Sequence, residues 1–310
     1  MGTNLDKLIN YLGSGFKNKP VLKIQFTDFW PGFDSLDNYF YKTLSTKYKL
    51  QICDKPDILI YSCFGNKFKE FNCLRIFYTG ENIRPDFSEC NFAIGFDYID
   101  NDRYLRLPLY ILYLEKHKAA NKIQVKRNEA TARRLWKSKS KFCCMVVSNP
   151  EAPERLSFFN NLNAYKRVDS GGAVLNNVGG PVADKMDFIK DYRFVIAFEN
   201  GSYPGYTTEK ILEPFLTGCI PLYWGNPIIG MEFNTQAFLN LDENLPEAEL
   251  IKKIIEIDSD ESKAIAMLMQ PILSGNITNK DIGTERVIAF FDQIYKEVSV
   301  KGEAVTAWNI

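Results

Sequence analysis

The feature that most constrains the fold of this chain is the repeated succession of short apolar runs and helical patterns. In the second half, apolar runs at residues 142–148 (FCCMVVS), 194–198 (FVIAF) and 220–224 (IPLYW) alternate with helical spacing at 154–162 and 208–217. Strands that follow one another through a helix need a crossover connection, which makes them parallel neighbours in one sheet with helices on its faces. We therefore predict an α/β unit in this half.

The first half shows the same alternation. Its strand candidates and helical patterns lie at residues 21–26, 50–53, 57–61, 75–78 and 92–95, and at 35–48 and 108–118, respectively. A polar, basic stretch at 119–141 separates the halves. We interpret it as a solvated helical linker rather than a nucleic-acid-binding arm, because it holds almost no aromatic residues. The length of 310 residues favours two cores. The prediction is an α/β protein with two Rossmann-like, doubly wound domains, 1–135 and 136–310, facing a central cleft.

Charge and residue counts exclude several classes of function. Lys plus Arg equals Asp plus Glu, 38 of each, so there is no global basic field to hold nucleic acid or an anionic membrane. The single histidine, His117, excludes a zinc site with several His ligands and disfavours a Ser-His or Cys-His catalytic pair. It lies in a polar stretch, and we expect it to be solvated. Seven cysteines, an odd number without a C-x-x-C pair, indicate free thiols in a reducing compartment.

The amino-terminal residues carry no signal-peptide pattern, because no basic start precedes a long apolar core. Their Met-Gly opening resembles a myristoylation signal only weakly, since position 6 is Asp rather than Ser or Thr. No run of about 20 apolar residues is available to span a bilayer. We expect no transmembrane segment and a cytoplasmic location, with peripheral attachment to an inner membrane left open.

The most informative segment covers residues 194–225. An apolar strand runs into Glu199 and Asn200, and a helix follows with Thr207 or Thr208 as its N-cap. Lys210 falls in the first turn, where unpaired N–H groups and the helix dipole already favour an anion. The residues alone leave open a second interpretation, in which Glu209 compensates the dipole and Lys210 is solvated.

Three further segments hold candidate residues at strand ends. Ser148 and Asn149 follow one strand, and Arg155 begins the next helix, where its fork would suit phosphate oxygens or simply face water. The pair Gly171 and Gly172 permits close backbone approach to a ligand or a plain turn, and it is not a P-loop. Glu81 follows the strand at 75–78, where a carboxylate can serve as a general base or be solvated.

The acidic pair Asp258 and Asp260 resembles a D-x-D arrangement that can hold a metal–nucleotide complex. It separates two helical patterns, at 249–257 and 262–273, and Glu261 lies three residues after Asp258. We favour a capping box that starts at Asp258. No other acidic cluster has metal-ligand spacing, so no metal site is predicted.

Several of these segments together resemble the α-1,3/4-fucosyltransferase family. The first motif of that family is similar to residues 78–82 (YTGEN), 92–97 (FAIGFD) and 102–108 (DRYLRLP). Its donor-binding motif is similar to 198–200 (FEN), 206–210 (YTTEK) and 220–225 (IPLYWG), and 148–150 with Arg155 and 171–174 also match. The resemblance covers roughly residues 75–240. The carboxy-terminal heptad repeats and basic tail of bacterial relatives do not occur in this sequence, nor does the amino-terminal anchor of animal relatives.

The resemblance implies a GT-B architecture whose carboxy-terminal domain holds GDP-fucose. Arg155 and Lys210 would contact the diphosphate, and Asn200, Tyr206 and Glu209 would line the nucleotide and fucose, with Ser148, Asn149, Gly171 and Gly172 also on the donor side. Glu81 would be the catalytic base of an inverting α-1,3 transfer to the N-acetylglucosamine of a β-galactosyl-N-acetylglucosamine acceptor, giving Lewis-type glycans. No tightly bound cofactor is expected, and stimulation by a divalent cation stays open.

Other functions remain as alternatives at this point. Two alternatives are also transferases: one forms an α-1,4 linkage, and the other uses a different GDP-sugar as donor. A glycoside hydrolase would pair Glu81 with Glu199 or Glu209 and would need no nucleotide. A catalytically silent protein would bind GDP-fucose without releasing GDP.

Overall fold

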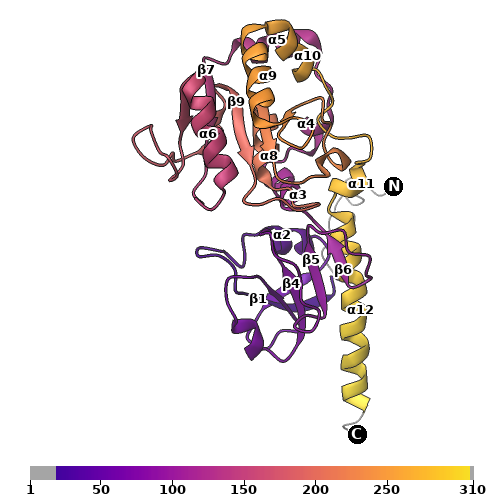
Figure 1. Ribbon diagram of the computed structural model, residues 1–310. Helices are drawn as coiled ribbons and strands as arrows, with labels where there is room; N and C mark the ends of the chain where they lie inside the picture. The colour runs from indigo at the N-terminus through magenta and orange to yellow at the C-terminus, as the bar shows by residue number, and fades with distance from the viewer. Residues whose placement is uncertain (1–18, 308–310) are drawn as a thin grey trace, which may run out of the picture.

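Two parallel β-sheets, one from each half of the chain, organise the molecule. The structure is a computed structural model that describes residues 19–307. Figure 1 shows the second sheet and its helices stacked above the first. The predicted α/β architecture with two parallel sheets is therefore confirmed.

The first sheet has six strands in the order β2-β1-β3-β4-β5-β6, all parallel. Their residues alternate between two cores: in β3, Ile58 and Ile60 pack into one hydrophobic cluster, and Leu59 and Tyr61 pack into the cluster on the opposite face. Burial of both faces is the normal condition of a parallel sheet. The strands are β1 (Val21–Thr27), β2 (Lys49–Ile52), β3 (Ile58–Tyr61), β4 (Leu74–Tyr78), β5 (Phe92–Gly95) and β6 (Tyr104–Arg106).

The second sheet has five parallel strands in the order β11-β10-β9-β7-β8. Its central strand β9 is fully buried from Phe194 to Phe198, as the run FVIAF predicts. The strands are β7 (Lys141–Met145), β8 (Val168–Ser170), β9 (Tyr192–Phe198), β10 (Ile220–Trp224) and β11 (Leu239–Asn240).

Helices cover the sheets and join them. The basic linker folds as α4 and α5, which confirms its helical interpretation. The division expected near residue 135 falls within α5 and remains a prediction. The helices are α2 (Tyr39–Ser45), η1 (Lys67–Glu70), α3 (Leu109–Lys116), α4 (Ala120–Gln124), α5 (Glu129–Lys137), α6 (Pro153–Tyr165), α7 (Lys185–Ile189), α8 (Glu209–Thr217), η2 (Ile229–Met231), α9 (Glu247–Ser259), α10 (Glu261–Leu268), α11 (Asn279–Ile282) and α12 (Glu285–Ala307).

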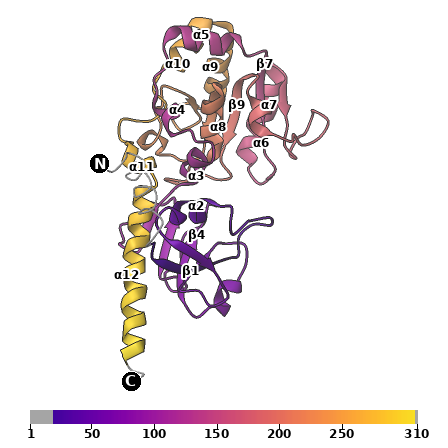
Figure 2. The ribbon, with the colours of Figure 1, turned by 180° about the vertical axis from the view of Figure 1, so that it is seen from behind.

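The carboxy-terminal helix α12 returns to the first sheet. Both views show it running alongside that sheet and projecting beyond it (Figure 1, Figure 2). Phe290 packs edge-on against Phe92 of β5 at 5.7 Å between ring centroids, and the carboxylate of Asp292 accepts hydrogen bonds from Lys47 and Tyr48. These contacts tie the end of the chain to its first domain.

Local signals in the sequence predicted some details well and others wrongly. Thr208, one of the two expected N-caps, caps α8, and Gly218 ends the helix in the left-handed conformation, at φ 73°. Asp260 rather than Asp258 caps α10, because the side chain of Asp258 is bound to Lys166 and Arg193 across the domain, at 2.7 Å from each. His117 is also not simply solvated, since it lies partly buried with Nε2 3.5 Å from the carboxylate of Glu213.

Candidate active site

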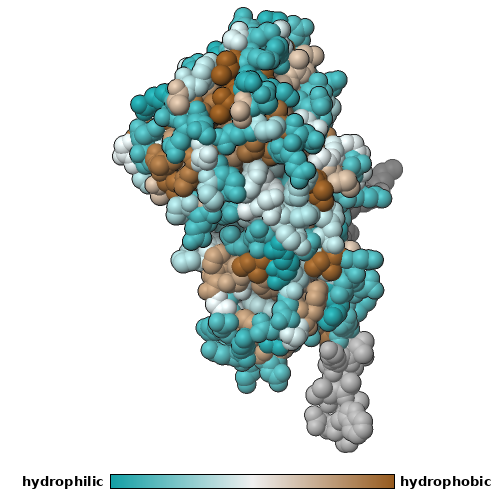
Figure 3. All heavy atoms as spheres, viewed as in Figure 1, coloured by the Kyte–Doolittle hydropathy of each residue, from teal (hydrophilic) through white to brown (hydrophobic). Residues whose placement is uncertain are grey.

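A cavity of about 820 Å³ lies between the two domains and is lined by residues of both. One wall comes from the loops after β1, β3 and β4 and from α2 and α3, and the other comes from the start of α8 and the loop before it. The carboxyl ends of parallel strands are where ligands bind in open α/β sheets. Elsewhere on the face seen in Figure 3, the surface is mostly hydrophilic and its hydrophobic residues form separate patches.

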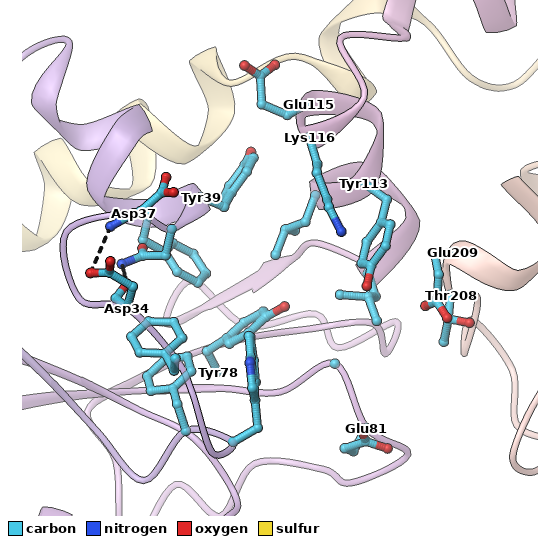
Figure 4. A pocket seen from close by; sticks show the side chains of 18 of the residues that line it. Asp34, Asp37, Tyr39, Tyr78, Glu81, Tyr113, Glu115, Lys116, Thr208 and Glu209 are labelled. Atoms are coloured by element: carbon cyan, nitrogen blue, oxygen red, sulfur yellow. Dashed lines mark hydrogen bonds between the residues drawn. The ribbon is translucent and has the colours of Figure 1, made fainter. Parts of the chain in front are cut away.

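Glu81 is the predicted residue on the first-domain wall. It follows β4 in a tight turn in which its N–H donates to Oγ1 of buried Thr79 at 2.9 Å. Its side chain is half-buried and lines the cavity (Figure 4). Within residues 19–307, no hydrogen bond or ion pair engages its carboxylate, which leaves that group available to a ligand.

The opposite wall is built around a buried carboxylate, that of Glu199, which is fully shielded from solvent. One of its oxygens accepts from the N–H of Thr208 at 2.8 Å, and the other accepts from the Thr208 hydroxyl at 2.6 Å. Lys210 Nζ lies 3.4 Å from the second oxygen. Glu199 thereby fixes both the N-cap residue and the first cation of α8.

One cation lies between two carboxylates at this helix end. Lys210 lies between Glu199 and Glu209, with Nζ 3.9 Å from the Glu209 carboxylate. Burial alone would lower the pKa of Lys210, but the two carboxylates outweigh it and raise that pKa, so the ammonium stays protonated. Burial alone would raise the pKa of Glu209, yet Lys210 and Lys185 bring it below its usual value. Burial raises the pKa of Glu199.

Arg155 lies behind this wall rather than on it, and its residue is 1% exposed. Its Nη2 donates to the carbonyl oxygens of Phe198 and Glu199, at 2.9 and 2.7 Å, and to Oδ1 of Asn200 at 2.9 Å. Its Nη1 donates to the carbonyl of Asn149 at 3.0 Å. In this arrangement Arg155 holds the strand end and orients the Asn200 side chain, which lines the cavity.

The remaining predicted donor-side residues divide into two groups. Tyr206 and Glu209 line the cavity together with Asn200 and Lys210. Ser148, Asn149, Gly171 and Gly172 are not among its lining residues and follow β7 and β8, and the carbonyl of Asn149 accepts from Arg155. A Cβ on Gly172 would lie 2.0 Å from the carbonyl oxygen of Val147, so this glycine allows the two loops to touch.

Sequence reasoning missed three features of the cavity. Tyr113 and Lys116, on α3, face the start of α8 across the cavity (Figure 4). Nζ of Lys116 lies 4.6 Å from the ring centroid of Tyr113. The helical spacing predicted α3 but not which face meets the other domain. Glu199 was considered as a polar residue at a strand end and as a possible hydrolase carboxylate, but not as the residue that holds the start of α8, because its partners become visible only when the strand end and α8 are placed in space.

The described part of the chain also bears on metal binding and membrane insertion. Within residues 19–307, no group of three or more His, Cys, Asp or Glu side chains is arranged to hold a metal ion. None of the described helices combines the length and apolar character needed to cross a bilayer. All seven cysteines are present as free thiols, four of them buried.

Comparisons with known proteins give a consistent result. Residues 24–113 match the N-terminal domain of α-(1,3)-fucosyltransferase FucT, and residues 136–266 match the C-terminal region of glycosyltransferase family 10 (fucosyltransferase). The α-(1,3)-fucosyltransferase FucT of Helicobacter pylori is 31% identical over 328 residues, which cover 92% of this chain and 68% of that protein. A putative fucosyltransferase of Acanthamoeba polyphaga mimivirus is 30% identical over 44% of this chain and 24% of its own length. A crystal structure of an α1,3-fucosyltransferase with GDP-fucose has 30% identity and a TM-score of 0.75, covering 90% of this chain and 91% of that one.

Proposed function

This chain belongs to the fucosyltransferases of glycosyltransferase family 10, and from that membership we propose that it transfers L-fucose from GDP-fucose to a saccharide hydroxyl with inversion at the anomeric carbon. The observation that carries the proposal is the interdomain cavity. Its first-domain wall holds an unpaired carboxylate, Glu81, and its second-domain wall holds a protonated Lys210 at a helix N-terminus.

The reaction divides between these two walls. Glu81 removes the proton from the acceptor hydroxyl as its oxygen attacks the anomeric carbon of fucose. The bond from that carbon to the diphosphate oxygen breaks, and its electron pair leaves with GDP. A general base contributes about 10²–10⁴-fold to such a step.

Lys210 stabilises the charge that develops on the departing diphosphate. Its position in the first turn of α8 adds the helix dipole to its own charge. Arg155 supports this wall from the protein interior, since its guanidinium binds the carbonyl of Glu199 and the amide oxygen of Asn200, and Asn200 lines the cavity. For a direct contact with a phosphate, the Arg155 guanidinium would have to give up a hydrogen bond to a carbonyl oxygen and form one to the phosphate instead.

The hydrolase alternative meets an obstacle at Glu199. That carboxylate is fully buried and is engaged by Thr208 and Lys210, so no sugar reaches it without rearrangement of α8. Glu209 lines the cavity, but Lys210 neutralises its charge at 3.9 Å. These contacts favour a transferase over a two-carboxylate hydrolase.

For the acceptor, we propose a β-galactosyl-N-acetylglucosamine unit that receives fucose in α-1,3 linkage. The deciding experiment measures GDP release from GDP-fucose against a panel of acceptor disaccharides, with linkage analysis of the product. A single α-1,3-fucosylated product from this unit supports the proposal. GDP binding without release in the presence of every acceptor would favour a silent binding protein.

A further inference from the structure

We propose that Trp30 and Phe64 form an aromatic platform that stacks against the second sugar ring of the acceptor, next to the ring that receives fucose. The proposal rests on the proposed function and adds to it the place where the acceptor binds. It follows from the strand order of the first sheet, from two exposed aromatic rings in the cavity wall, and from the bonds that hold their loops together.

The strand order places the platform on one side of the catalytic base. Trp30 follows β1, Phe64 follows β3 and Glu81 follows β4, and these strands are neighbours in the order β1-β3-β4. Neighbouring strands are about 4.8 Å apart, so the ends of β1 and β4 are roughly 10 Å apart. With one sugar ring at Glu81, a second ring would extend along the wall toward Trp30.

Both rings line the cavity and are exposed to an unusual degree. Trp30 is 45% exposed and Phe64 is 48% exposed, and their ring centroids are 6.4 Å apart. The ring planes are nearly perpendicular, at 83°, so the platform is a corner in which a sugar ring stacks on one ring and meets the other at its side. Below them, Phe29 and Phe33 stack at 3.9 Å, and Trp30 meets Phe33 edge-on at 5.3 Å. The inner rings hold the platform rigidly, while the outer rings keep apolar surface in water that a ligand would cover.

A dedicated set of hydrogen bonds joins the two loops, and Asp28 makes most of it. Its carbonyl oxygen accepts from the N–H of Phe64 at 3.0 Å, and its carboxylate accepts from the N–H groups of Lys67 and Phe68 at 3.0 and 2.8 Å. Asp28 has φ 58°, a left-handed conformation that is uncommon for a residue other than glycine. Such backbone strain is typical of sites that need a fixed geometry.

The chemistry of the wall suits a saccharide. A sugar ring presents C–H groups on its faces and hydroxyls at its edge, so a face packs on the electron-rich face of an aromatic ring. Tyr78, the last residue of β4, also lines the cavity, and its hydroxyl has no hydrogen-bond partner among residues 19–307. Figure 4 shows this hydroxyl on the side of the ring that faces Tyr113. This hydroxyl is buried, so an acceptor would reach it only if the wall rearranged, and the platform does not depend on it.

The test compares a disaccharide with a monosaccharide. It uses the disaccharide of highest turnover from the acceptor panel and the monosaccharide that carries the same accepting hydroxyl. For Trp30→Ala we expect the KM of the disaccharide to rise roughly tenfold, the effect of uncovering on the order of 50 Å² of apolar ring surface. In Trp30→Ala, the KM of the monosaccharide, the kcat and the affinity for GDP should stay within twofold of the wild-type values. Trp30→Phe should bring the disaccharide KM most of the way back to the wild-type value.

Two further variants guard against unfolding and unspecific effects. Phe64→Ala should show the same split between disaccharide and monosaccharide if Trp30→Ala fails to fold. Tyr165→Ala is the matched control, because Tyr165 is 43% exposed but lies on α6 away from the cavity, and it should change neither KM. A disaccharide KM that stays unchanged in both platform variants, or a monosaccharide KM that rises equally, would overturn the platform.

Failure of the proposed function is a different result. If the wild-type protein releases no GDP with any acceptor, the transferase proposal fails, and the platform is then judged by tryptophan fluorescence. β-Galactosyl-N-acetylglucosamine is titrated into the GDP-containing protein. A fluorescence change that disappears in Trp30→Phe supports the platform on its own, and the absence of any change in the wild type overturns it.

Discussion

Replacement of Lys210 by Met tests the anion site at the start of α8 most directly. We expect the variant to bind GDP at least about 100-fold more weakly. Lys210 is the cavity-lining cation of this wall, and it also shields the two carboxylates within 4 Å of its Nζ, Glu199 at 3.4 Å and Glu209 at 3.9 Å. In the variant a diphosphate would lose its cation and face both carboxylates without compensation.

The magnitude follows from these distances. Two unit charges about 4 Å apart interact by about 4 kcal/mol at an effective dielectric constant of about 20. Even if one third of this is lost to rearrangement in the free protein, the remainder is about 2.7 kcal/mol, or about 100-fold in affinity. Because the site is largely shielded, added salt should reduce the effect only slightly.

Calorimetric titration provides the assay, with GDP as the ligand and guanosine as the control ligand that lacks phosphates. The double variant Lys210→Met with Glu199→Gln should bind GDP more tightly than Lys210→Met alone, because it removes one of the uncovered carboxylates. A GDP affinity within twofold of the wild type would refute the reasoning. So would an equal loss for guanosine, since that would indicate a damaged nucleoside pocket.

Three other predictions concern separate parts of the molecule. Glu81→Gln should lower turnover at least about 100-fold while calorimetry finds GDP affinity unchanged, because a general base contributes about 10²–10⁴-fold; near-normal turnover would refute the role. Gly172→Ala should lower the free energy of unfolding, measured by urea titration, by about 3 kcal/mol, the upper end for an overpacked site, because its Cβ would overlap the Val147 backbone. Gly275→Ala is the control and should leave this free energy unchanged, because its Cβ meets no atom within 4 Å. Arg106→Met should cost about 3–5 kcal/mol by leaving the buried carboxylate of Glu232 without its ion pair; the double variant with Glu232→Gln should recover part of that loss, and an additive result would contradict the pairing.

The parts of the fold that the sequence predicted are those that depend on neighbouring residues. The buried run of β9 and the N-cap at Thr208 each follow from a short window, since hydrophobic period and capping chemistry act over a few residues. The strand ends that carry Glu81 and Asn200 were predicted on the same basis.

What the sequence did not predict depends on contacts between distant residues. The phosphate contact expected of Arg155 stays a prediction, but its bonds to carbonyl oxygens 43 and 44 positions away were not foreseen. Asp258 was expected to cap a helix, but Lys166, 92 positions earlier, binds it. The partner of a charged side chain is one of the polar groups that surround it in the folded structure. A single sequence does not show which groups these are.

The loop from Asn200 to Thr207 contacts both domains, and these contacts fix the position of one cavity wall relative to the other. The guanidinium of Arg84 stacks on the ring of Tyr203 at 3.3 Å, and the Tyr203 hydroxyl donates to Asp97 at 3.2 Å. Arg106 of β6 binds Glu232 at 2.8 Å, and the same carboxylate accepts from the Thr207 hydroxyl at 2.6 Å.

Through these bonds, the loop from Asn200 to Thr207 contacts residues of both domains. A rotation that opened the cavity would have to separate Arg106 from a carboxylate that is fully buried, which is costly because the charge would stay without a partner. The positions of Glu81 and Lys210 relative to each other are therefore fixed before a ligand binds. Donor and acceptor can then meet with little reorganisation of the protein, which is the condition under which fixed charges stabilise a transition state most effectively.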